Sequence, residues 1–200
     1  RDLEIRGAGN LLGAEQHGHI EAIGYDLYCK LLNQAVLALK GEKEQEDFET
    51  VIDFNIDAYI PPSYIKNEAQ KMEIYKRIAA IETDEDAMDM RDELIDRFGD
   101  VPRPVENLLE IAQLKALAHS AYVTELTGNK SQVRLSMYGE APVRAEEIPG
   151  LVKSYGGALK FTASGQPGFT LTDRRNENRE ARQMLEKVKI LLNSIKELLV

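Results

Sequence analysis

The stretch that decides the fold is FGDVPRPVENLLEIAQLKALAHSAYVTELTGNKSQVRLSM, from Phe98 to Met137. Its first half predicts a helix over about residues 105–121, which two prolines open. In its second half apolar residues recur at every second position, and we expect residues 122–126 to pair with 133–137 across a Gly-Asn turn. A helix followed directly by a hairpin indicates a fold that combines helices with a small sheet.

Upstream of this stretch, the segment Val51 to Ile60 (VIDFNIDAYI) alternates apolar and polar residues and is followed by two prolines. That pattern predicts a half-buried strand. Two helices should follow, over about residues 67–82 and 84–98. Thr83 is the expected N-cap of the second helix, with Asp86 at the capping-box position.

Downstream, the pattern predicts a short helix near residues 151–155 and a strand pair at 159–162 and 169–171. A long amphipathic helix should then occupy residues 176–199. The fold class we expect for residues 51–200 is therefore α+β, mostly helical, with a small antiparallel sheet.

Ahead of this domain, residues 1–20 (RDLEIRGAGNLLGAEQHGHI) are rich in glycine and predict an ordered loop. Residues 21–40 show helical spacing of apolar side chains. Residues 42–50 are polar and mostly acidic, which predicts a flexible linker. The chain thus divides into residues 1–41, the linker 42–50 and the domain 51–200.

Hydrophobic residues make up 43% of the 200-residue chain and charged residues 30%, which suits a globular protein. The net charge of -9 argues against a generic basic nucleic-acid binder or a membrane-surface protein. A single cysteine, Cys29, excludes an internal disulfide and fits a reducing cytosol, so we expect a cytoplasmic protein. Since the chain begins at Arg1 without an initiator Met, we expect a fragment of a longer protein.

Several chemistries lack their motifs: there is no P-loop, no GxSxG elbow and no dinucleotide-binding fingerprint. His17 and His19 form an HxH pair without a third ligand at a diagnostic spacing, which favours polar loop residues over a zinc site. Cys29 falls on an apolar helix face, which favours a core position. We predict no catalytic residue, metal site or cofactor site in this chain. An enzyme with an unrecognised site in the α+β domain stays as an alternative.

Two segments concentrate charge. Glu82 to Asp100 is strongly acidic, which favours a solvated helix face, with an acidic protein-docking face as the alternative. The last helix is rich in Arg and Lys, but Glu177, Glu180 and Glu186 are interleaved with them. This mixture favours a salt-bridged surface over a phosphate-binding stripe.

The glycine-rich opening places Arg6 just before Gly7-Ala8-Gly9, with Gln16 ten residues later. Glycines allow sharp turns and close backbone approach, while Arg and Gln supply several hydrogen-bond donors. Such a loop could move a guanidinium group between partners. Spacing alone leaves a structural loop and a functional loop equally open.

RDLEIRGAGNLLGAEQHGHI closely resembles the segment after the last helicase motif in the transcription-repair coupling factor (Mfd) family and, more loosely, in RecG helicases. The resemblance to the coupling factors continues through IGYDLYCKLLNQAV, IDFNIDAYIPPSYI, EIYKRIAAIET and RDELIDRFGDVPRPVENLLEIAQLK. It covers nearly the whole chain and is weakest after residue 122. RecG has nothing comparable after its motif, so the coupling factors are the better match.

This resemblance implies a double-stranded-DNA translocase whose upstream motor binds ATP and magnesium, displaces stalled RNA polymerase and recruits the repair protein UvrA. Residues 1–41 would be the distal end of a superfamily 2 motor lobe, in which a translocation motif couples ATP hydrolysis to movement. By the match, the motif residues would be Arg6, Gly7, Gly9, Gly13, Gln16 and Gly18.

Residues 51–200 would be the regulatory C-terminal domain. In this family that domain packs on the N-terminal UvrB-like module of the same parent chain and hides the UvrA-binding surface. A RecG-like helicase C-terminus and a stand-alone protein-interaction module are the alternatives.

Overall fold

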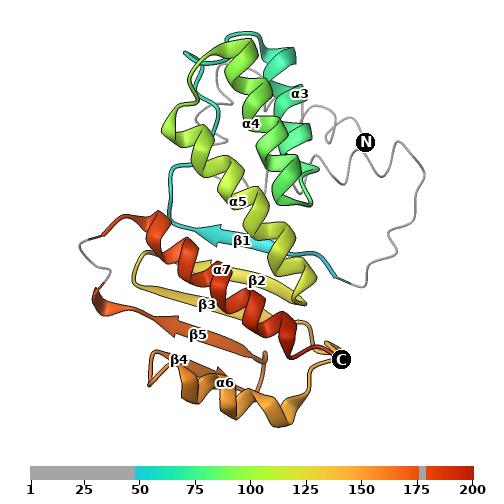
Figure 1. The fold of residues 1–200 in the computed structure, drawn as a ribbon, viewed down its shortest axis with the longest axis vertical. Coiled ribbons are helices and arrows are strands. Elements are labelled where there is room, and N and C mark those ends of the chain that lie inside the picture. The colour runs from blue at the N-terminus through green and yellow to red at the C-terminus, as the bar shows by residue number, and fades with distance from the viewer. Residues whose placement is uncertain (1–47, 176–178) are drawn as a thin grey trace. The chain divides into compact units, whose positions relative to one another are not determined.

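The computed structural model describes residues 48–175 and 179–200, which form two compact units (Figure 1). Of the described residues, Asp57–Gln113 make up the first unit, and Phe48–Ile56 with Leu114–Val200 make up the second. Helices and a five-stranded sheet are both present, which confirms the expected α+β class.

The first unit is helical. It contains α3 (Glu68–Ala79), α4 (Asp84–Phe98) and the start of α5 (Arg103–Ser120), all close to the predicted ranges. The predicted capping box at the start of α4 is confirmed, since the Thr83 side chain accepts from the Asp86 backbone and the Asp86 side chain accepts from the Thr83 backbone. Gly99, with a φ of 85°, ends that helix in a conformation that favours glycine.

Buried polar groups fix the loop that precedes α3. The backbone N–H of Ile60 donates to the Tyr75 hydroxyl at 2.8 Å, and Tyr75 is only 1% exposed. The side-chain amide of Asn107 donates to the carbonyl of Asp57 at 2.9 Å. The first part of the loop, at Asp57 and Ile60, is therefore held by side chains of α3 and α5, which fixes the path of the chain there.

The second unit is built on a sheet with the strand order β1-β2-β3-β5-β4. The strands are β1 (Val51–Phe54), β2 (Val123–Gly128), β3 (Gln132–Met137), β4 (Leu159–Thr162) and β5 (Gly168–Thr172). The expected antiparallel sheet is wrong in one respect, because β1 runs parallel to β2 and the sheet is mixed. A long connection through α3, α4 and α5 separates these two strands, which allows a parallel pairing that a short turn would forbid.

The first strand is shorter than the segment 51–60 that its alternation predicts. Of the four alternating residues expected on the buried side (Ile52, Phe54, Ile56 and Ala58), the two within the strand, Ile52 and Phe54, are buried, whereas Ile56 and Ala58 are half-buried. Phe54 lies opposite Gly128, the last residue of β2, and the N–H of Asn55 makes the final hydrogen bond to the carbonyl of Gly128 at 3.1 Å before the chain of β2 turns at Asn129. The ladder therefore ends there, and the chain enters the first unit at Asp57.

Both predicted strand pairs are confirmed as antiparallel, β2 with β3 and β4 with β5. The turn between β2 and β3 is organised by Asn129, whose side-chain oxygen accepts from the backbone N–H groups of Ser131 and Gln132 at 2.9 and 3.2 Å. Asn favours turns because its side chain replaces backbone acceptors in this way.

The last helix, α7 (Ala181–Glu197), lies in front of the sheet in Figure 1 and buries one apolar face. The side chains of this face are completely buried: Met184, Leu185, Val188, Leu191, Leu192 and Ile195. Arg144 donates to the carbonyls of Glu197 and Leu199 at the end of α7, where a cation is favoured. Short helices η1 (Ala145–Glu147) and α6 (Ile148–Ser154) precede β4.

The expected loop 1–20, the helix 21–40 and most of the linker 42–50 lie outside the described residues, as do residues 176–178 in the last predicted helix. At the end of the linker segment, Phe48 stacks on Tyr138 with ring centroids 4.7 Å apart. Thr50 is 4% exposed and donates to the carbonyl of Val123 at 2.7 Å. The domain boundaries stay a prediction.

Candidate protein-docking surfaces

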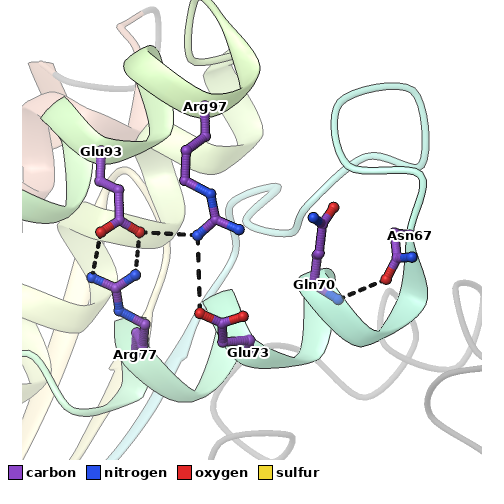
Figure 2. A network of polar contacts seen from close by, with 6 residues as sticks. All are labelled: Asn67, Gln70, Glu73, Arg77, Glu93 and Arg97. Atoms are coloured by element: carbon purple, nitrogen blue, oxygen red, sulfur yellow. Dashed lines mark hydrogen bonds and ion pairs between the residues drawn. The ribbon is translucent and has the colours of Figure 1, made fainter.

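The outer side of the first unit is held by a network of charges between α3 and α4 (Figure 2). Arg77 donates to both carboxylate oxygens of Glu93. Arg97, which follows Glu93 by one turn of α4, contacts the same carboxylate at 3.1 Å. Arg97 also lies 3.9 Å from Glu73. The hydrogen bond from Arg77 is the main cause that lowers the pKa of Glu93, and its reciprocal raises the pKa of Arg77. This network fixes how α4 lies on α3.

The opposite flank of α4 is tied to α5 and to the preceding loop. Arg91 pairs with Glu106, and the Gln113 amide donates to Asp84 at 2.9 Å. The Tyr64 hydroxyl donates to the carbonyl of Gly99 at 2.9 Å, just past the end of α4. With partners on both flanks, α4 presents one fixed face to solvent.

That exposed face of α4 carries a row of carboxylates, here called the acidic stripe: Glu85, Asp89, Asp92 and Asp96. Their spacing of four, three and four residues places them along one side of the helix. Met88 and Ile95 lie on the same side and are 65% and 45% exposed, unusually high for large apolar side chains. The predicted solvated face is therefore confirmed as exposed. Its two apolar residues are also a feature of docking faces.

The basic side chains near the last helix do not all form the salt-bridged surface that the sequence favours. Lys187 pairs with Asp173, and Lys189 lies 3.4 Å from Glu186. Three arginines, Arg174, Arg175 and Arg179, instead line a cavity of about 520 Å³ with Lys187. We call it the basic cavity. Glu177, one of the expected acidic partners, lies outside the described residues.

His119 lies in the last turn of α5. Its Nδ1 is 3.0 Å from the Thr50 hydroxyl, and its ring packs on Phe48 with centroids 4.5 Å apart. These contacts give the histidine a packing role within the second unit.

The predicted translocation-motif residues cannot be placed, because Arg6, Gly7, Gly9, Gly13, Gln16 and Gly18 all lie outside the described residues. The same holds for His17, His19 and Cys29. Within residues 48–175 and 179–200 no group of three metal-ligating side chains comes together. Nor does any helix in that part of the chain have the length and apolar character to cross a membrane.

The basic cavity is the site that sequence reasoning missed. Arg174, Arg175 and Arg179 are a visible cluster, but the interleaved glutamates suggested mutual neutralisation. The sequence does not show that the fold places these arginines around one cavity together with Leu171 of β5 and Ile190 of α7.

Comparison with known proteins is consistent across sequence and structure. A family model described as the TRCF domain matches residues 54–148. The chain is 40% identical to the transcription-repair-coupling factor of Staphylococcus haemolyticus and 38% identical to that of Bacillus subtilis. Each alignment covers 98% of this chain, which spans only 16% and 17% of those relatives.

A solved structure, the crystal structure of the C-terminal domain of transcription-repair coupling factor, matches with a TM-score of 0.62 and 26% identity. The match covers 75% of this chain and 95% of that one. The chain belongs to the transcription-repair coupling factor family, and its fold is that of the C-terminal domain of this family. The assignment favours this family over the RecG-like alternative.

Proposed function

We propose that this chain is the C-terminal part of a transcription-repair coupling factor that acts as an ATP-dependent double-stranded-DNA translocase. Such a parent displaces stalled RNA polymerase and recruits UvrA for nucleotide-excision repair. The observation that carries the proposal is the match to the family's C-terminal domain, which covers 95% of that domain. ATP and magnesium would bind upstream, in the motor of the parent, and residues 1–41 would be the end of that motor.

Residues 1–20 would couple ATP hydrolysis to movement on DNA. The proposal rests on the RG-x-G and G-x-x-Q-x-G pattern, in which Arg6 and Gln16 supply the polar groups. A guanidinium that changes partners between ATP-bound and ATP-free states would transmit the state of the motor to the DNA.

Residues 51–200 would act as an autoinhibitory clamp that masks the UvrA-binding surface on the N-terminal UvrB-like module. The acidic stripe supports this role, because exposed carboxylates around Met88 and Ile95 combine charge steering with apolar contact area. The network of Arg77, Glu93 and Arg97 holds α4 in place, so this face would need little reordering on docking.

An intramolecular clamp does not require high affinity. A domain tethered to its partner has a high effective concentration, so a modest interface can keep it closed. Opening then requires that DNA or polymerase bind the open state more favourably than the closed state by only a few kcal/mol. UvrA binding by the parent, measured with and without residues 50–200, tests the clamp. Stronger binding after the deletion would support it, and unchanged binding would leave the domain without this role.

A further inference from the structure

The basic cavity lies entirely within the second unit. It is formed by residues at the end of α6 and before β4, by β5, by residues 173–175 and 179, and by α7. The residues that line it are Tyr155, Ala158, Leu171, Thr172, Asp173, Arg174, Arg175, Arg179, Lys187 and Ile190. Its volume of about 520 Å³ falls within the range of roughly 300 to 1,000 Å³ that is typical of ligand pockets.

The charge of the cavity is opposite to that of the chain. One acidic residue, Asp173, is among the lining residues, and it is occupied by Lys187 and by the backbone N–H of Arg175 at 3.0 Å. Within the described residues, no ion pair or hydrogen bond involves the side chains of Arg174, Arg175 and Arg179. Three guanidinium groups therefore face solvent at one cavity in a chain whose net charge is -9.

Part of the wall is apolar. Tyr155, Ala158 and Leu171 lie on the side of α6 and β5, and Ile190 of α7 completes it. Ile190 is 63% exposed, whereas Val188 and Leu191 beside it on the same helix are completely buried. An exposed isoleucine at the edge of an arginine-rich cavity offers a contact for an apolar group of a ligand.

We propose that the basic cavity binds an acidic segment of a protein partner, with an apolar side chain against Ile190 and Leu171 and carboxylates on the arginines. Guanidinium groups bind carboxylates with two parallel hydrogen bonds, which favours a fixed pose of the segment. Nucleic acid fits less well, because phosphates need cations spread along a track, and these are gathered at one concave site with an apolar wall. This inference is independent of the clamp, which uses acidic residues of the other unit.

The test is fluorescence anisotropy with the 200-residue chain and labelled nine-residue peptides. The probes have Phe or Leu at the centre and Asp or Glu around it; matched peptides replace the centre by Ala or the acids by Gln and Asn. We expect the acidic Phe or Leu peptides to bind in a salt-sensitive manner. The Ala peptides should bind several-fold more weakly, and the Gln/Asn peptides at least about tenfold more weakly.

The variants locate the site. Arg175→Glu combined with Arg179→Glu should weaken binding at least about tenfold, and Ile190→Ser several-fold. Lys196→Glu changes an exposed cation on α7 outside the cavity and should have no effect. Far-UV circular dichroism, together with an unchanged denaturation midpoint, checks that each variant is folded.

Three results would overturn the proposal. One is that none of the acidic peptides binds. Another is that Lys196→Glu weakens binding as much as the arginine variants, which would mean non-specific attraction. The third is that a 20-nucleotide single strand or duplex binds more tightly than every peptide through the same arginines, which would make the cavity a nucleic-acid site.

Discussion

Arg77 of α3 and Glu93 of α4 face each other in a two-pronged ion pair, with Nη2 of the arginine 2.9 Å from Oε1 of the glutamate (Figure 2). The pair is partly exposed, so its contribution to stability is modest. Its importance is geometric, because it sets the position of the helix that carries the acidic stripe.

Replacing Glu93 by Gln should make the chain less stable at neutral pH, by about 0.2 to 1 kcal/mol. The folded state lowers the pKa of Glu93 through Arg77 and Arg97, so the stabilisation is present above the pKa of the unfolded chain. It is lost as the pH falls through the lower, folded pKa. Urea denaturation of both proteins at neutral pH and in the acid range should show the difference shrinking toward acid pH.

The control for this change is Glu73→Gln, since Glu73 lies 3.9 Å from Arg97 and is more exposed. Its effect should be smaller at every pH. If the free energies of unfolding of Glu93→Gln and the unchanged chain differed by the same amount from neutral to acid pH, the assigned cause would be contradicted.

Thr83→Ala should destabilise the chain by about 1 kcal/mol, because it removes the side chain that accepts from the Asp86 backbone at the start of α4. Thr83→Ser keeps the hydroxyl and should restore most of the loss. Thermal or urea unfolding measures both. Equal stability of the Ala and Ser variants would show that the cap contributes nothing.

Gly128→Ala should disrupt the hairpin of β2 and β3. A Cβ atom there would lie 2.2 Å from the carbonyl oxygen of Gln132 and 2.7 Å from the Cα of Val133, and both are backbone atoms that cannot move aside easily. We expect a loss of about 1–3 kcal/mol or more in the free energy of unfolding. Gly139→Ala is the matched control, because its added methyl would meet nothing within 4 Å. Similar stability of the two variants would contradict this packing argument.

In the parent protein, Arg6→Ala and Gln16→Ala should each leave ATP hydrolysis standing while abolishing movement along DNA. The physical reason is that these residues are proposed to couple the two activities and belong to no ATP-binding motif in this chain. A DNA-dependent ATPase assay and a strand-displacement translocation assay, run on the same preparation, measure the two separately. A parallel fall in both activities would assign Arg6 to the ATP site instead.

Local features of the fold could be predicted from the sequence. The Thr83–Asp86 capping box, the hairpin at Asn129 and the apolar face of α7 each depend on residues within a few positions of one another. Their signals are turn chemistry and periodicity, which neighbouring residues determine.

Long-range features could not be predicted in the same way. Alternation in Val51–Phe54 gives the buried face of a strand but neither its partner nor its direction, and Val51 pairs with the distant Glu125. The basic cavity likewise depends on residues from Tyr155 to Ile190 meeting in space. The local sequence pattern does not show which distant residues come together in the fold.

The measurement that tests the clamp most directly is the affinity of the parent protein for UvrA, with and without residues 50–200. A parent carrying Asp89→Lys with Asp92→Lys tests whether the acidic stripe is the docking face, and Glu140→Lys with Glu146→Lys, two exposed acidic residues of the second unit, is the matched charge change elsewhere. A clamp should give a large gain in UvrA affinity on deletion, a partial gain with the lysine pair and none with the control. Unchanged UvrA affinity after the deletion would contradict the clamp role.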